Sequence, residues 1–222
     1  MVVPSIVVPC LPEPPRRGET NLAKPTYAER VFINVPFDAP YQRLFRALVF
    51  VIHDCGFVAR CATEDDNSLQ VRVDKLYEII RTSKYSVHDI SRLRARYNMP
   101  LELGIVLGAK KFGNTRQKQK RALILDTEAY RYQRFCSDIA GQDIRAHHNT
   151  VQGLIRSVRN WLRASPDTQG IILPSAGFIF RRYRAFSARL PRLCAAVNLD
   201  AEDLHFLDLR VLITGWLKVN PR

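Results

Sequence analysis

The sequence predicts an α/β fold with a doubly wound parallel sheet and a C-terminal helical appendage. From residue 30 to residue 169, short apolar runs alternate with segments whose apolar residues recur at helical spacing. The apolar runs are continuous, which is typical of parallel strands buried on both faces. Beyond Gly170 the pattern changes to two helical segments. Repeated strand and helix at this pitch indicates parallel crossovers, hence an open sheet with helices on both sides.

The chain divides by composition into three predicted parts. Residues 1–29 are rich in proline and polar groups and are predicted to form a flexible arm. The α/β domain is predicted over 30–169 and the helical appendage over 170–222. The longest apolar run, 47–52, is far shorter than the roughly 20 residues that cross a bilayer, so no membrane span is predicted. Five scattered cysteines without metal-ligand spacing favour a cytoplasmic setting and no metal site.

The first two strand–helix cycles are short and clear. A β-branched run over 31–35 predicts a strand that Pro36 ends, and apolar spacing predicts a helix from Tyr41 to Ile52. Residues 57–61 predict the second strand. An acidic loop and a helix over 69–80 complete that cycle.

The later elements follow the same logic. Strands are predicted over 85–90 and 122–126, and a helix begins near Pro100, a residue favoured in a first helical turn. The basic stretch 110–121 is predicted to be a solvated loop. Residues 130–149 are predicted to form a short helix or an ordered loop over the strand ends, and 151–162 an amphipathic helix. Two more helices are predicted over 178–197 and 201–217, the second with Asp200 as its cap.

Two acidic residues are predicted at the ligand-binding edge of the sheet. Asp89 ends the third strand and Glu102 starts the next helix. Both positions face the crevice at the carboxyl ends of parallel strands. There, Glu102 can attack an anomeric carbon or stabilise its developing positive charge, and Asp89 can hydrogen-bond a base or a ribose hydroxyl. Both residues also have an explanation without catalysis. Glu102 could be an acid at a helix start, where the macrodipole favours negative charge, and Asp89 could close the turn at the end of its strand.

A family resemblance follows from three groups of residues. They are Asn34-Val-Pro-Phe-Asp38 with Tyr41, then His88-Asp89, then Asn98-Met-Pro-Leu-Glu-Leu-Gly104 with Gly108-Ala-Lys110. Together they resemble the nucleoside 2-deoxyribosyltransferase-like group over roughly residues 30–165. That group is similar to the TIR-type domains, which carry a glutamate in this part of a flavodoxin-like fold and include enzymes that hydrolyse nicotinamide dinucleotide.

The resemblance implies roles for individual residues. Glu102 would be the nucleophile or the stabiliser of the oxocarbenium ion, and Asp89 would orient base or sugar. The pocket would be lined by Phe37, Asp38, Tyr41 and Asn98. Two departures matter: the first loop lacks the glycines common in such transferases, and the helical C-terminal third has no counterpart in either family. The acceptor, water or a second base, stays open.

Other polar residues are also candidates for the pocket. Asp126 ends the fourth strand and is a predicted substrate-binding residue, with Tyr130, Tyr132 and Asp138 nearby in sequence as weaker candidates. His147 and His148 are neighbours whose side chains diverge, so a loop role is favoured over a shared metal. Dinucleotide-binding glycines, a phosphate-binding P-loop and a nucleophile elbow are absent from the sequence, and no cofactor is predicted.

The charge distribution suggests anionic partners without choosing among them. The formal net charge is +13, and Lys plus Arg minus Asp plus Glu gives +1 for 1–30, +5 for 31–144 and +7 for 145–222. Such a field attracts phosphates, nucleic acid or an acidic protein, although a solvated basic surface needs no partner. The stretch Arg181-Arg-Tyr-Arg184 could dock nucleic acid or a protein, or pack its aromatic side inward with its arginines outward.

The leading prediction is therefore cleavage of the N-glycosidic bond of a nucleoside or nucleotide, with NAD as one substrate. The resemblance also implies a homo-oligomer and a bacterial defence or signalling role. The competing prediction is a nucleotide-sensing or protein-interaction module without turnover. A weaker third prediction is a nucleic-acid-associated protein that uses the basic C-terminal helices.

Overall fold

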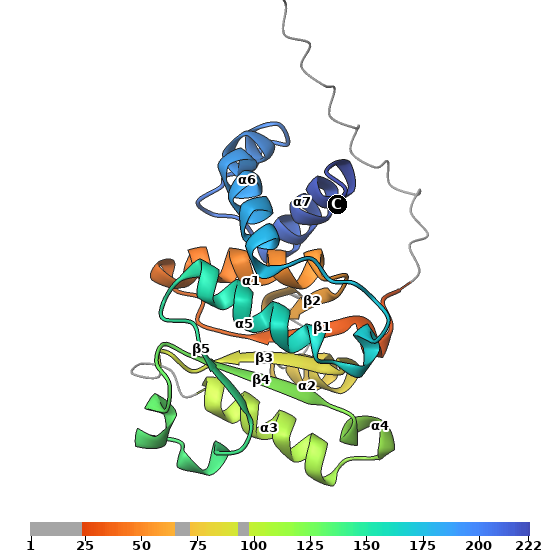
Figure 1. Cartoon of the computed structure of the whole chain (residues 1–222), viewed down its shortest axis with the longest axis vertical. Coiled ribbons are helices and arrows are strands. Elements are labelled where there is room, and N and C mark those ends of the chain that lie inside the picture. The colour runs from red at the N-terminus through yellow and green to blue at the C-terminus, as the bar shows by residue number, and fades with distance from the viewer. Residues whose placement is uncertain (1–23, 65–71, 93–97) are drawn as a thin grey trace, which may run out of the picture.

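The computed structural model describes residues 24–64, 72–92 and 98–222, and in them a five-stranded, all-parallel sheet forms the centre of the molecule (Figure 1). The strand order is β2-β1-β3-β4-β5. The strands are β1 (Arg30–Asn34), β2 (Val58–Cys61), β3 (Tyr85–Asp89), β4 (Arg121–Asp126) and β5 (Asp143–Ala146). The predicted doubly wound, flavodoxin-like topology is confirmed.

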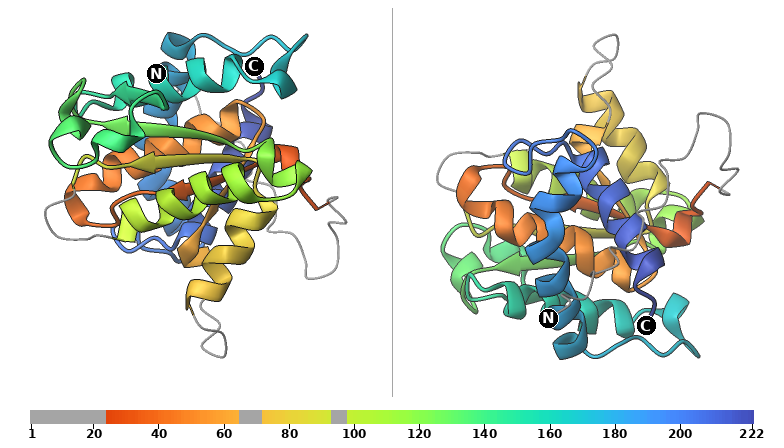
Figure 2. Two further views of the ribbon diagram at one scale, coloured as in Figure 1. Left: turned by 90° about the horizontal axis from the view of Figure 1, so that it is seen from below. Right: turned by 90° about the horizontal axis from the view of Figure 1, so that it is seen from above.

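Helices cover both faces of the sheet (Figures 1 and 2). On one face lie α1 (Gln42–Asp54) and α5 (Val151–Arg163), and on the other lie α2 (Arg72–Thr82) and α3 (Asn98–Phe112). Neighbouring strand residues alternate between the two: Val31 and Ile33 join the α1–α5 core, whereas Phe32 joins a cluster with α2 and α3. The continuous apolar runs of the sequence thus reflect burial on both sides.

The C-terminal helices form a third layer on the outside of α1 (Figure 2). These are α6 (Ala176–Ala195) and α7 (Phe206–Val219). The ring of Phe50 in α1 lies 5.4 Å from that of Phe186 in α6 and 5.7 Å from that of Trp216 in α7. The predicted appendage therefore shares one hydrophobic core with the sheet.

The cap of α7 differs from the prediction. The helix begins at Phe206, and the Nδ1 atom of His205 accepts a hydrogen bond from the backbone N–H of Leu207. Asp200 instead accepts from the backbone of Glu202, within the loop that precedes the helix. Asp200 is six residues before the helix, too far to act as its cap.

Two segments in the β4–β5 half of the sheet also differ from the sequence prediction. The region 130–149, predicted as a short helix or a loop, contains two 3-10 turns followed by the edge strand β5. The basic stretch is not a solvated loop: α3 continues to Phe112, and α4 (Thr115–Lys118) follows. Lys120 is buried, and its ammonium group donates to the carbonyls of Ile80 (2.5 Å) and Ser83 (2.6 Å) near the end of α2. Burial lowers the Lys120 pKa to about 8.

The described end of the predicted arm is attached to the domain. Tyr27–Glu29 form a 3-10 turn, and the Tyr27 ring stacks against the guanidinium of Arg116 at 4.2 Å. Residues 1–23 lie outside the described range. Across the described residues, the helices are all too short or too polar to traverse a lipid bilayer.

Candidate functional site

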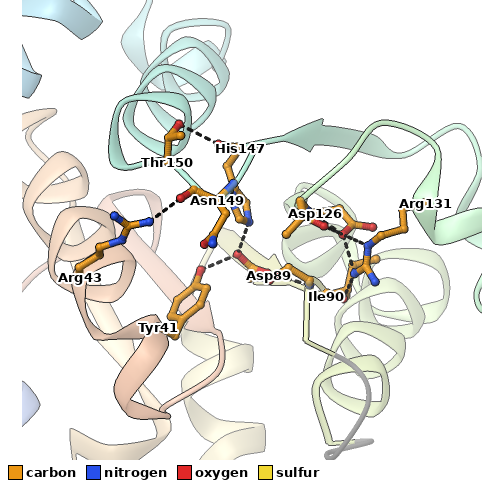
Figure 3. Close-up of polar contacts among 11 residues, drawn as sticks. Tyr41, Arg43, Asp89, Ile90, Asp126, Arg131, His147, Asn149 and Thr150 are labelled. Carbon is orange, nitrogen blue, oxygen red and sulfur yellow. Dashed lines mark hydrogen bonds and ion pairs between the residues drawn. The ribbon is translucent and has the colours of Figure 1, made fainter.

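Buried polar side chains gather where the parallel strands end, as the close-up in Figure 3 shows for three of the strands. Asn34 ends β1, Asp89 ends β3, Asp126 ends β4, and His147 directly follows β5. All four are at most 3% exposed. Because burying polar groups is costly unless they are paired, their contacts decide what each can do.

Asp89 is enclosed by three neighbours (Figure 3). The Tyr41 hydroxyl donates to Oδ2 at 2.5 Å, and the Ser91 backbone N–H donates to Oδ1 at 2.8 Å. The Nε2 atom of His147 lies 3.1 Å from Oδ2, a close approach without the alignment of a hydrogen bond. Burial and the Asp89 charge raise the pKa of Tyr41 well above its usual value, so this phenol stays protonated and donates.

His147 is held by the loop that joins β5 to α5. Its Nδ1 accepts from the Asn149 backbone N–H at 3.0 Å, so a neutral ring carries its proton on Nε2, on the side of Asp89. His148 and Asn149 both have left-handed backbones, with φ of +52° and +51°, a conformation that side-chain-bearing residues seldom adopt. Thr150 then caps α5 by accepting from the Gly153 N–H.

Sequence reasoning missed His147 as a site residue. Of the two neighbouring histidines, His147 lies against Asp89. The signal that could have found it is its place between a strand and a Thr-capped amphipathic helix. That signal requires β5 to be recognised first. In the part of the chain that the structure describes, no three His, Cys, Asp or Glu side chains are grouped to hold a metal ion.

Asp126 holds an arginine at the same edge. Its Oδ1 accepts from Arg131 Nε at 2.6 Å, and the Arg131 Nη2 also donates to the Ile90 carbonyl at 2.8 Å. Burial, together with the nearby Asp89 charge, raises the pKa of Asp126 in spite of this arginine. Its Oδ2 is buried without a hydrogen-bond partner. Asp126 would therefore influence a ligand through Arg131, whose side chain is 21% exposed.

The β1–β3 boundary is where the chain reverses its winding direction, the position at which open α/β sheets bind ligands. The side-chain amide of Asn34 lies there and donates to the Met99 carbonyl at 2.9 Å, which fixes the first turn of α3 to the end of β1. The same amide nitrogen lies 2.9 Å from Nδ1 of His88. Burial lowers the His88 pKa to about 3, so its neutral ring accepts. Asn34 was not selected from sequence.

Glu102 was predicted at the start of a helix, but α3 begins at Asn98, so Glu102 lies in its second turn; it is half-buried. Its charge contributes to raising the pKa of the Cys61 thiol to about 11, although burial of that thiol is the main cause. The Glu102 carboxylate is therefore near the end of β2. Asp89 instead points toward Tyr41 and His147 on the α1–α5 face. Its carboxylate accepts hydrogen bonds from the Tyr41 hydroxyl and the Ser91 backbone N–H, and His147 Nε2 lies beside it.

The other predicted pocket residues are placed as follows. The Phe37 ring packs edge-on against Phe45 at 5.5 Å, toward the core. Asp38 caps the 3-10 helix η2 (Ala39–Tyr41) and pairs with Arg92 at 3.1 Å. Asn98 is the first residue of α3 and is exposed. Tyr41 is buried at Asp89, so Asp38, Asn98 and Glu102 are the candidates with solvent access.

Two described cavities lie away from this edge. One, of about 280 Å³, is lined by residues of α1, α6 and α7, among them Asp54 and Arg182. The other, of about 190 Å³, lies beside Lys110 and Asp143 near the opposite ends of β4 and β5. The segments 65–71 and 93–97, which follow β2 and β3 in sequence, are outside the described residues. What is known of the carboxyl edge is therefore the set of contacts that its described side chains make.

Comparison with known proteins adds no assignment. No protein-family model matches the chain, and no curated protein or solved structure matches it either. The sheet topology and the contacts at its carboxyl edge are therefore the basis for any functional proposal.

Proposed function

We propose that this protein binds a nucleoside or nucleotide at the β1–β3 switch point and cleaves its N-glycosidic bond, with NAD as one substrate. The observation that carries the proposal is the Asn34–Met99 hydrogen bond. It ties the start of α3 to the end of β1 and so brings Glu102 to the carboxyl side of the sheet. The resemblance of the Asn98–Gly104 segment to nucleoside-processing enzymes supports the same reading.

In this proposal Glu102 is the catalytic residue. As the glycosidic bond breaks, the base leaves with the bonding electrons and positive charge develops at the anomeric carbon. The Glu102 carboxylate stabilises that charge or attacks the carbon, and water completes hydrolysis. Asn98 and Asp38, both accessible, contact the sugar or base. A cytoplasmic homo-oligomer acting in bacterial defence or signalling is the setting that the resemblance implies.

Asp89 has a different part from the one expected from sequence. Because Tyr41, Ser91 and His147 enclose its carboxylate, we assign Asp89 as a positioning residue. It joins the loops that follow β1, β3 and β5. In the same way, Asp126 positions Arg131, whose guanidinium is available to a substrate phosphate.

The test is product analysis by chromatography after incubation with NAD and a panel of nucleosides and nucleotides. Wild type should release free base, and Glu102→Gln should reduce the rate by about 100-fold or more, as expected for loss of transition-state charge stabilisation. Glu128→Gln, which changes an exposed carboxylate in the loop after β4, is the matched control and should retain the wild-type rate. Equal rates in both variants would contradict the role of Glu102.

The alternative is a nucleotide-sensing or protein-interaction module. The observation in its favour is the enclosure of Asp89. Because this carboxylate is buried, the predicted pair of carboxylates is not complete at the ligand. This alternative predicts no product from wild type under any condition. It also predicts that NAD or a nucleotide raises the melting temperature equally in wild type and in Glu102→Gln.

A further inference from the structure

Helix α6 has one apolar face and one arginine-rich face. Its apolar side chains pack inward: Ile179, Tyr183, Phe186, Leu190 and Cys194 are buried. Arg181, Arg184, Arg189 and Arg192 are all exposed on the opposite side. At 100° per residue they lie within an arc of about 140°, and they extend over about 16 Å of the helix axis. We call these four residues the α6 arginine face.

The acids that follow the α6 arginine face in sequence, Asp200, Glu202 and Asp203, lie in the loop after the helix, and among the described residues none of them pairs with the face. From Ile144 to Leu199 the sequence contains nine arginines, no lysine and one acidic residue, Asp167. Asp167 is itself paired with Lys84, at 2.7 Å. A fifth α6 arginine, Arg182, pairs with the buried Asp54. Across the described residues, the four arginines of the face make no ion pair, and only Arg181 has a ring contact, with Phe178 at 5.8 Å.

We propose that the α6 arginine face binds the phosphate backbone of a nucleic acid duplex without sequence preference. The face is fully charged at any physiological pH, and guanidinium groups match phosphate oxygens in geometry. Ala185 and Ala188 lie between the arginines, so a backbone can approach the helix closely. Because α6 is part of the outermost layer (Figure 2), the face is open to a large partner.

A lipid surface fits these observations less well. A helix that lies in a membrane interface inserts its apolar face between the lipids. In α6 the apolar face is buried against α1, where the ring of Phe186 packs against that of Phe50. The outward face carries the four arginines with alanines between them, and the nearby Phe178 ring is half-buried. A nucleic acid needs nothing more than this for binding through phosphates.

The experiment is fluorescence anisotropy of a labelled 20-base-pair DNA duplex, titrated with full-length protein at 50, 100 and 200 mM KCl. Four phosphate contacts predict that log K falls with log salt with a slope of about −3.6. A variant with Arg181, Arg184, Arg189 and Arg192 changed to Gln should bind at least about 100-fold more weakly at 100 mM. The same four positions changed to Lys should keep most of the affinity.

The matched control removes four exposed positive charges elsewhere: Lys110, Lys111, Lys118 and Arg134, each changed to Gln. Its net charge equals that of the α6 variant, so it should stay within about threefold of wild type if the face itself binds. Equal weakening in both variants would overturn the proposal, because net charge alone would then explain binding. So would the absence of duplex binding at 50 mM KCl, or binding to vesicles with phosphatidylserine but not to the duplex.

Discussion

The two faces of the sheet differ in how deeply they are packed. The α1–α5 face carries a continuous core that reaches from Val31 in β1 through α1 to Trp216 in α7. The α2–α3 face has two smaller clusters, one around Phe32 and Ile80 and the other around Ile124 and Leu103. One face therefore has two helical layers above the sheet and the other has one (Figure 1). We infer that the first is the rigid scaffold and the second the more easily opened side.

The same difference separates the two carboxylates singled out from the sequence. Asp89 points to the deeply packed face, where Tyr41 and His147 lock it in place. Glu102 belongs to α3, on the thinner face, and stays half-buried. Two acids that border the same edge in sequence can thus have unequal parts. The packed one joins the loops around it, and the other stays partly accessible to solvent.

The largest effect should come from equal truncations in the two cores. Leu48 in α1 and Leu103 in α3 are both at most 2% exposed. Leu→Ala changes cost about 2–5 kcal/mol, more where the surroundings cannot collapse into the cavity. We expect Leu48→Ala near the top of this range and Leu103→Ala near the bottom, measured by urea unfolding. Equal losses would show that the two faces are packed equally well.

Arg131→Ala should cost about 3 kcal/mol at pH 8, the lower end for breaking a buried ion pair, since this guanidinium is partly exposed. The pKa of Asp126 is already raised by burial, and loss of Arg131 raises it further. A buried carboxyl group with a raised pKa destabilises the folded state at a pH where the group is ionised. This cost disappears at a lower pH, where the group is protonated. The penalty should therefore shrink as pH falls from 8 to 5.

The prediction is checked by urea unfolding of Arg131→Ala and of wild type at pH 8 and at pH 5. Arg134→Ala, at the exposed end of the same 3-10 turn, is the control and should stay within about 0.5 kcal/mol of wild type. A penalty for Arg131→Ala that does not change with pH would mean that Asp126 is not the group left unpaired.

Tyr41→Phe should have the smallest effect, about 1–2 kcal/mol, because it removes one hydrogen bond to the buried Asp89 and leaves its backbone and His147 partners. Thermal or urea unfolding measures it. Tyr132→Phe, at another buried ring, serves as the comparison and should change stability by less than about 0.5 kcal/mol. No difference between the two variants would argue against a locked Asp89.

The sequence predicted the fold well wherever burial on both faces left a clear apolar run. Four strands and the helices α1, α2 and α3 were found in this way, whereas α4 was predicted as a loop and β5 was missed. It is an edge strand of four residues, exposed or half-buried along its length, with a charged residue at Asp143 and at Arg145. Such a strand has neither a continuous apolar run nor a clean alternation. Missing it also hid His147, whose importance depends on following a strand.

The site was predicted less completely, because its contacts link residues that are distant in the chain. Tyr41, Asp89 and His147 come from loops after three different strands. Lys120 is an extreme case: it lies in a basic run that predicts a solvated loop, yet its ammonium group caps carbonyls 37 and 40 residues away. Local patterns cannot show such contacts. The place of Asp89 at the end of its strand was evident from the sequence, whereas α3 begins at Asn98, so Glu102 lies in its second turn and not at its start.

The most direct test of the two-face comparison is amide hydrogen exchange of the full chain, followed by mass spectrometry. We predict that peptides from α2 and α3 exchange at least about 10-fold faster than those from α1 and α5, because the thinner face opens locally while the other exchanges with global unfolding. Equal exchange of α3 and α1 would contradict the view that the face carrying Glu102 is the one that opens.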